Sequence, residues 1–265
     1  MSSDEQDFSP MDDMFEEPSD YHAPPPAPTQ HTVARQEGCI PDGTPAAWDL
    51  VLVGHHSLWA HCLWNAGVFL AHHFDAHPEL VRGKTVLELG AAAALPSFAA
   101  ATQGAALSVA TDYPEKPLID MITNNAEKNL PAAVANGSLV VQGYLWGADP
   151  QPLLDRLPEG KTRFDLLVLA DLLFNHSEHH AMLRSVQNTM AEDGQAIVIF
   201  SSHRPWKADA DLNFFNLAKE APYHFEVEKV LETKMKPMFE NDPGCEEIRS
   251  TVLMFSLRHG KPASE

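Results

Sequence analysis

The sequence predicts an α/β fold, built on a Rossmann-like, doubly wound sheet that ends in an antiparallel C-terminal hairpin. From residue 84 onward, short apolar runs rich in β-branched residues alternate with longer stretches whose apolar residues recur at helical spacing. This alternation is typical of parallel strands joined by right-handed helical crossovers. Near the C-terminus, the apolar runs 225–231 and 251–257 follow one another without a helical pattern between them, which indicates an antiparallel pair at an edge.

The first patterned segment runs from Trp48 to Val53 and is interpreted as a strand that ends at Gly54. An amphipathic helix is expected over 58–74, where apolar residues recur at helical spacing. The alternating region then predicts strands at 85–89, 107–111, 139–141, 164–169 and 196–200, and helices at 91–102, 118–129, 179–190 and 212–221. Because the run 164–169 is almost entirely apolar, we expect a central strand that is buried on both faces.

The length suits one large domain or at most two small ones, and the composition argues against nucleic-acid and membrane partners. The chain has 265 residues, of which 44% are hydrophobic. Its 18 Lys and Arg residues against 37 Asp and Glu give a formal charge of −19, and so acidic a surface repels the phosphates of nucleic acids. No run of about 18 apolar residues is present, so no membrane-spanning helix is expected. The start MSSDEQD has neither a basic nor an apolar segment, which predicts a cytoplasmic protein.

Residues 1–45 are predicted to form a disordered, acidic, proline-rich tail, and residues 46–260 to form the folded domain. The first 30 residues contain eight acidic residues, six prolines and no Lys or Arg. Such a composition cannot bury enough apolar surface to offset the entropy of ordering the chain. Met14 and Phe15 lie inside this acidic run, as incidental apolar residues of a solvated tail or as a short segment that docks on the domain or on a basic partner.

The cysteines and histidines do not predict a metal site. Cys39, Cys62 and Cys245 are odd in number and far apart, so free thiols in a reducing compartment are expected. Three of the fourteen histidines lie between residues 176 and 180, but no cysteine or carboxylate cluster accompanies them.

The turn after the first parallel strand is a candidate cofactor loop, because doubly wound sheets bind ligands at the carboxyl ends of their strands. Gly90 permits a tight turn there. A dinucleotide fingerprint needs glycine at its first, third and sixth positions, which here are Gly90, Ala92 and Leu95, and Leu95 argues against a nicotinamide cofactor. S-adenosylmethionine sites have an acid followed by small residues at alternate positions. Glu88 and Gly90 fit that pattern, whereas Ala92 and Ala94 replace the usual glycines. A buried, alanine-rich helix start is the alternative.

Two further acids end neighbouring strands. Asp112 follows Gly90 by 22 residues, where a carboxylate accepts hydrogen bonds from both hydroxyls of a ribose. Its alternative role is to open a turn before Pro114. Asp171 follows the apolar run 164–169 and Ala170, and is expected at the mouth of the same cleft. The joint occurrence of these strand-end features predicts a nucleotide-type cofactor site.

At this point the residues match a known family. The segments VLELGAAAALP, ATDYP, YLWG and LADLLFNHSEHH resemble the seven-strand protein lysine methyltransferases. The segments MFEEPSDY, HSLWAHCLWNAG, SSHRPW and KPMFENDPG are similar to a fungal group within that family, whose acceptor is translation elongation factor 1-alpha. The resemblance covers roughly residues 14–258. It implies a seven-strand methyltransferase sheet, S-adenosylmethionine as cofactor, and methylation of the factor's N-terminal α-amine and an adjacent lysine.

The resemblance also implies roles for particular residues. Trp64 would lie beside the cofactor, with Trp59 as the fallback, and Ala170 would close the pocket. The other implied cofactor contacts are the backbone cradle of Gly90, Ala91 and Ala92, the ribose-binding Asp112, and Trp146 beside the adenine. Asp171 begins an Asp-x-x-Phe element and would be the catalytic residue that positions the acceptor amine, with Phe174 and Trp206 as aromatic walls for a methylated, cationic product. The methyl group of Ala92 departs from the family's glycine and could crowd the cofactor.

Structural roles for these residues, and other activities for the protein, stay open as alternatives. Trp64 could be a core residue and Trp146 a loop anchor, while the segment 203–206 could contact substrate or be a structural loop. Small-molecule N-methylation, of nicotinamide for instance, is the competing activity on the same cofactor domain. A binding module without activity is another alternative, because of Ala92.

Overall fold

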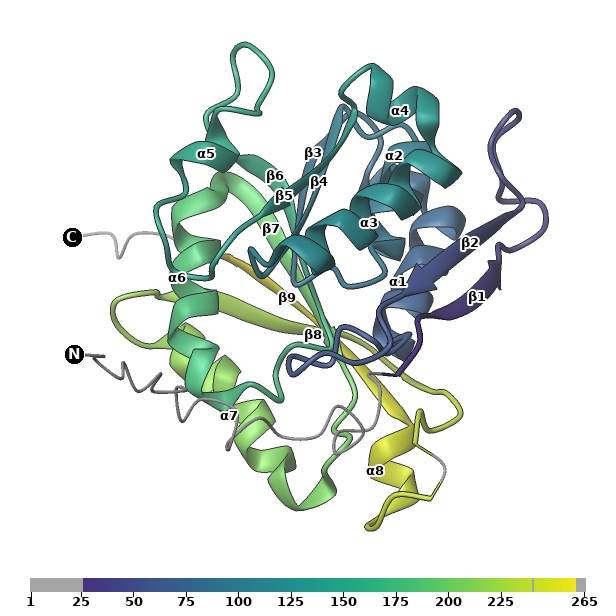
Figure 1. Cartoon of the computed structure of the whole chain (residues 1–265). Coiled ribbons are helices and arrows are strands. Elements are labelled where there is room, and N and C mark those ends of the chain that lie inside the picture. Colours follow the sequence, from purple (N-terminus) through teal and green to yellow (C-terminus); the bar gives the residue numbers. More distant parts are fainter. Residues whose placement is uncertain (1–25, 240, 261–265) are drawn as a thin grey trace, which may run out of the picture.

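The computed structural model describes residues 26–239 and 241–260, which form a seven-stranded sheet with helices on both faces and a separate two-stranded sheet (Figure 1). The strands of the large sheet are β3 (Thr85–Leu89), β4 (Leu107–Asp112), β5 (Leu139–Gly143), β6 (Phe164–Ala170), β7 (Met190–Phe200), β8 (Phe225–Lys234) and β9 (Thr251–His259). The α-helices are α1 (Asn65–Ala76), α2 (Leu95–Thr102), α3 (Lys116–Asn129), α4 (Pro131–Ala135), α5 (Gln151–Leu154), α6 (His179–Thr189), α7 (Ala208–Lys219) and α8 (Glu246–Ser250). The short 3-10 helices are η2 (Pro78–Leu80), η3 (His176–Glu178) and η4 (Pro205–Lys207).

The large sheet has the strand order β5-β4-β3-β6-β7-β9-β8. The strands from β5 to β7 are parallel, and the direction in which the chain adds strands reverses between β3 and β6. This reversal is the topological switch point at which doubly wound sheets bind ligands. β9 pairs antiparallel with both β7 and β8. The predicted doubly wound sheet with an antiparallel C-terminal hairpin is confirmed, and the hairpin places β9 inside the sheet and β8 at its edge.

Each face of the sheet has its own hydrophobic core. β3 is buried along its whole length, and its side chains alternate between the two faces. Val86 packs in the core that contains residues of α1, α2 and α3, whereas Leu87 and Leu89 pack in the core that contains residues of α6 and α7. β6 is buried over most of its length, as its continuous apolar run predicts.

The small sheet corrects the predicted domain boundary. β1 (Thr29–Ala34) pairs antiparallel with β2 (Ala47–Leu52), so the segment 29–34 is ordered and the prediction of disorder through residue 45 is wrong there. The inward-facing residues of β2 are buried, and the side-chain amides of Asn125 and Asn129 on α3 hydrogen-bond its backbone. This burial stabilises the pair, and composition alone does not reveal it. Residues 1–25, with the apolar pair of the tail, lie outside the described residues.

Two helices begin later than their apolar patterns predict. The pattern over 58–74 becomes α1 only from residue 65, and the pattern over 91–102 becomes α2 only from residue 95. Trp59, Ala92 and Ala94 have φ angles of 62°, 43° and 56°, in the left-handed region that no right-handed helix contains. The residues before α1 and α2 are therefore loops, and both loops border the candidate site.

The C-terminal region contains one element that the sequence pattern does not predict. The short helix α8 lies between β8 and β9, where two consecutive strands are expected. Among the described helices, none is both long enough and apolar enough to cross a membrane.

Candidate functional site

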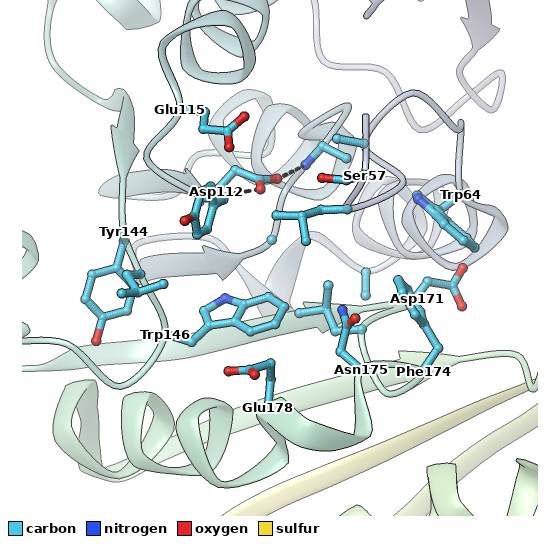
Figure 2. Close-up of a pocket in the computed structure, with 18 of the residues that line it drawn as sticks. Ser57, Trp64, Asp112, Glu115, Tyr144, Trp146, Asp171, Phe174, Asn175 and Glu178 are labelled. Carbon is cyan, nitrogen blue, oxygen red and sulfur yellow. Dashed lines mark hydrogen bonds between the residues drawn. The ribbon is translucent and has the colours of Figure 1, made fainter. Parts of the chain in front are cut away.

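A cavity of about 430 Å³ lies at the carboxyl ends of β3, β4, β5 and β6 (Figure 2). Its lining includes seven of the eight residues that the sequence analysis places at the site, namely Trp64, Gly90, Ala92, Asp112, Trp146, Ala170 and Asp171. The eighth, Ala91, is not part of the lining. It is buried in the turn, and its N–H donates to the carbonyl oxygen of Thr111 over 2.8 Å.

The turn after β3 requires glycine at its first position. Gly90 has a φ of 63°, and a Cβ atom there would lie 2.6 Å from Leu172 Cδ2 and 3.0 Å from Trp146 Cζ2. Both the backbone conformation and the close approach of these side chains therefore exclude a larger residue. Two residues further on, Ala92 keeps a left-handed conformation without being glycine, which costs about 1–2 kcal/mol.

The carboxylate of Asp112 is buried and joins two strand ends. Its Oδ2 accepts the N–H of Ala92 over 2.7 Å, and its Oδ1 accepts the N–H of Tyr113 over the same distance. Burial raises the pKa of Asp112, and the two backbone hydrogen bonds act against that rise. Each oxygen retains acceptor capacity on a residue that lines the cavity, so the carboxylate fits the paired hydroxyls of a ribose.

Trp146 follows β5 and presents its indole to the cavity beside the glycine turn (Figure 2). The next residue, Gly147, has a φ of 76° and donates its N–H to Ser185 Oγ on α6 over 2.8 Å. The hydroxyl of Tyr144 donates to the carbonyl oxygen of Ala148 over 3.1 Å. These contacts hold the loop in place, so that Trp146 offers a flat, rigid surface that suits a stacked purine base.

The acid of the loop pattern, Glu88, does not line the cavity. Its side chain is buried, and Oε2 accepts the N–H of Ser97 over 3.0 Å together with the Ser97 hydroxyl. Burial raises the pKa of Glu88 to about 8, against the hydrogen bonds from Ser97, which lower it. Because Ser97 lies in the first turn of α2, Glu88 joins this helix to β3. Its role is structural.

Asp171 has backbone in the cavity wall, but its carboxylate is engaged elsewhere. The side chain is 0% exposed, and its oxygens accept the N–H groups of Ala66 and Ser201, each over 3.0 Å. The Nε2 atom of His203 lies 3.2 Å from Oδ1. This geometry does not fit the predicted contact between the Asp171 carboxylate and an acceptor amine. Asp171 instead holds the start of α1 and the end of β7 together, and so positions Trp64, the N-cap residue of α1.

Four rings from four segments form an aromatic cluster at the end of the cavity next to α1. Trp64 stacks on Phe174 with centroids 5.5 Å apart, and its ring lies 5.1 Å from His203 and 6.1 Å from Phe239. Phe239 belongs to the connection between β8 and β9. Trp206, the second predicted aromatic wall, is 62% exposed and is not part of the cavity lining. The ring of Phe239 replaces it in the cluster.

Sequence reasoning missed several residues of the site. Polar residues that line the cavity without having been predicted include Ser57, Tyr113, Glu115, Asn175 and Glu178. Most of them lie within a few residues of a predicted strand end, which is the signal that could have found them. Within residues 26–239 and 241–260, no group of three or more His, Cys, Asp or Glu side chains is arranged to hold a metal ion.

The fold and the cavity together define a class of protein. A doubly wound sheet with a glycine turn after the first parallel strand and a buried acid after the next is the arrangement of S-adenosylmethionine-dependent methyltransferases. Two solved structures share the fold. The candidate methyltransferase SMU.776, solved with SAH, has a TM-score of 0.54 at 15% identity and covers 89% of this chain and 57% of its own. The candidate RNA methyltransferase PH1948 from Pyrococcus horikoshii has a TM-score of 0.51 at 16% identity, over 76% and 84%.

The family profile described as lysine methyltransferase matches residues 54–221. The chain therefore belongs to the lysine methyltransferase family, and its methyl donor is S-adenosylmethionine. Relatives named "Protein N-terminal and lysine N-methyltransferase EFM7" are 41% identical in Kluyveromyces lactis, over 93% of this chain and 96% of the relative, and 44% identical in Neurospora crassa, over 92% and 87%. The Schizosaccharomyces pombe relative of that name is 42% identical over 90% and 92%.

Proposed function

We propose that this protein methylates the N-terminal α-amine, and an adjacent lysine, of translation elongation factor 1-alpha. The observation that carries the proposal is the identity of 41% and 44%, over more than nine tenths of the chain, with fungal proteins named as protein N-terminal and lysine N-methyltransferases. The cytoplasm, where the factor is made, is the proposed location. The free thiols of Cys39, Cys62 and Cys245 suit that reducing compartment.

The cavity has one end suited to the cofactor and another suited to the acceptor. Asp112 and Trp146 come from the ends of β4 and β5 and would hold the ribose and adenine. When bound, the cofactor would supply a methyl group on a sulfonium, and a neutral nitrogen would take that methyl as the thioether leaves. Across the switch point, the residues after β6 and before α1 place Phe174 and Trp64 at the opposite end. An acceptor amine would therefore enter on the β6 side.

The ionisation of the acceptor ranks the two amines. At pH 7, an α-amine with a pKa near 7.7–8 is neutral in roughly one molecule in ten, whereas a lysine with a pKa near 10.4 is neutral in roughly one in 2,500. The difference of about 2.5 pKa units corresponds to about 3.5 kcal/mol. The N-terminal amine is thus the easier acceptor, and the lysine needs more help from the site.

Charge on this protein favours a basic partner. The net charge of the chain is −19. The cavity lining includes Glu178 and Glu115, and the side chain of Glu115 is 51% exposed. Such a surface attracts a basic protein over distances that salt screens. The value of kcat/KM for the intact factor should therefore fall as ionic strength rises, and a value independent of salt would contradict this recruitment.

The decisive experiment compares acceptors for the purified full-length chain. Elongation factor with an unmodified N-terminus, the same factor with an acetylated N-terminus, and nicotinamide are each incubated with S-adenosylmethionine, and the products are mapped by mass spectrometry. Methyl groups should appear on the free α-amine and the adjacent lysine, and acetylation should abolish the first of these. Transfer to nicotinamide alone would support the small-molecule activity instead.

A second measurement addresses the binding-module alternative. Calorimetric binding of S-adenosylmethionine without transfer to any of these acceptors would favour a module without activity. In cells that lack this chain, the N-terminal peptide of the factor should lose its methylation, and an unchanged peptide would contradict the proposal.

A further inference from the structure

Asn175 occupies a capping position without capping. It is the N-cap residue of η3, with φ −86° and ψ 68°, and its side chain makes no capping hydrogen bond. Asparagine at such a position normally accepts a backbone N–H from the following turn. Here the carboxamide lines the cavity, and no residue in the described part of the chain hydrogen-bonds it. A half-buried amide in an active-site cavity therefore retains its full hydrogen-bonding capacity.

The carboxamide lies between the two ends of the cavity. Figure 2 shows the Asn175 side chain pointing into the cavity, with Trp146 on one side and Phe174 on the other. The predicted nucleoside contacts lie on the Trp146 side, and the aromatic cluster around Trp64 lies on the Phe174 side. The amide is thus the polar group next to the place where acceptor and methyl donor would meet.

Asp171, the acid four residues earlier, cannot serve this purpose in the observed arrangement. Its carboxylate is 0% exposed and is held by Ala66, Ser201 and His203. Asn175, by contrast, is on the same loop after β6 and faces the cavity, and its side chain has no hydrogen-bond partner among the described residues.

We infer that the side-chain oxygen of Asn175 accepts an N–H from the acceptor amine and aims the nitrogen lone pair at the methyl group. This inference rests on the proposed function. The nitrogen lone pair forms the new N–C bond while the electron pair of the S–C bond stays on sulfur. The excess proton of an ammonium acceptor leaves to water before the bond forms.

A neutral amide suits this reaction better than a carboxylate. A carboxylate beside the nitrogen stabilises the ammonium form, which has no lone pair, and raises its pKa by about 1–3 units. An amide oxygen orients the N–H with much less of that penalty. On its own turn Asn175 is followed by Glu178 and by His176, which pairs with Asp211 of α7, and Arg204 donates to the carbonyl oxygen of the preceding Phe174. Across the cavity lie Asp112, Glu115, Tyr113 and Tyr144, and Asp171 and His203 form a buried pair.

The test uses the full-length chain with the substitutions Asn175→Asp and Asn175→Ala, and Asn216→Ala on the exposed side of α7 as the matched control. The acceptor is a peptide with a free N-terminus. Asn175→Ala should lower kcat about 10-fold or more, because the amine is no longer oriented, with the Kd for S-adenosylhomocysteine within about twofold of the wild-type value. Asn175→Asp should shift the ascending limb of the kcat-pH profile by about 1 unit or more to higher pH. The control should match the wild type in every measurement.

Peptide binding covers the case in which Asn175→Asp is inactive. In the presence of S-adenosylhomocysteine, this variant should bind the cationic peptide more tightly than the wild type at about pH 6. Equal affinity would overturn the inference, as would an unshifted kcat-pH profile or an unchanged kcat in Asn175→Ala. Parallel losses of cofactor affinity and rate in Asn175→Ala would also overturn it. Failure of the wild-type chain to methylate any free N-terminus contradicts the proposed function itself, and is thereby distinguished from a failure confined to the variants.

Discussion

The N–H of Ala92 donates a 2.7 Å hydrogen bond to the carboxylate of Asp112, and this contact joins the turn after β3 to the end of β4. The bond explains how the turn keeps a left-handed conformation at a residue that is not glycine. It also means that the acid placed to bind the ribose is oriented before the cofactor arrives.

We expect Asp112→Asn to weaken binding of S-adenosylhomocysteine by roughly 10–100-fold. The amide retains one acceptor oxygen, whereas the charge and the second acceptor are lost, and a hydrogen bond to a charged group contributes about 1.5–3 kcal/mol. Titration calorimetry measures the effect, with Asp155→Asn at the exposed C-cap position of α5 as the control. An affinity within about twofold of the wild-type value would show that the ribose is held elsewhere.

Ala92→Gly should leave the protein as stable as the wild type or up to about 1.6 kcal/mol more stable. Glycine removes the backbone strain of about 1–2 kcal/mol at φ 43°. Its larger conformational entropy in the unfolded state destabilises the folded protein by about 0.4–1 kcal/mol. Cofactor affinity should stay equal or increase, because a methyl group leaves the cavity wall. Urea unfolding and calorimetry check both quantities, and weaker binding by the glycine variant would contradict the view that this methyl crowds the site.

Asp171→Ala should lower the free energy of unfolding by about 3 kcal/mol. The substitution strips partners from two backbone N–H groups and from His203 in a buried environment, where loss of one partner is costly. Asp120→Asn removes an exposed carboxylate paired with Lys116 and should cost less than about 1 kcal/mol. If both variants unfold at the same urea concentration, Asp171 is not the anchor that its contacts indicate.

Glu88 should make stability depend on pH. The folded-state pKa is about 8, against 4.5 for the free group, so the folded protein binds more protons than the unfolded chain between these values. The contribution of Glu88 to the free energy of unfolding therefore falls as pH rises from about 4.5 to about 8, and is constant outside that window. The difference in stability between Glu88→Gln and wild type should accordingly grow in favour of Gln over this range. A difference that stays constant between pH 4.5 and about 8 would contradict the raised pKa of Glu88.

Local patterns predict the order of strands and helices well, because β-branched runs and helical spacing reflect burial in the two layers of the sheet. They fail where isolated residues adopt left-handed conformations, as Trp59 and Ala94 do, since no periodicity reports a φ angle. They fail again for β1, which is mostly exposed and is ordered by pairing with β2, a strand that the side chains of Asn125 and Asn129 on α3 hold in turn.

Sequence patterns likewise predict one part of the candidate site and miss another. Residues at strand ends, such as Gly90 and Asp112, can be found from sequence because the topology brings strand ends together. The direction of a side chain cannot be found in this way. Asp171 and Asn175 lie four residues apart on one loop, yet one carboxylate turns into the protein and one amide turns into the cavity. Phe239 joins the aromatic cluster only through folding of the connection between β8 and β9.

The position of β9 has a consequence for biosynthesis. This strand, residues 251–259, is the final one along the described chain, yet it is hydrogen-bonded on both sides, to β7 and to β8. While the ribosome still holds these residues in its tunnel, β7 has an open, apolar edge that other chains could pair with. The sheet therefore closes only after residues 251–259 have left the tunnel, and a nascent chain that pauses before residue 251 exposes a strand edge that a chaperone would have to protect.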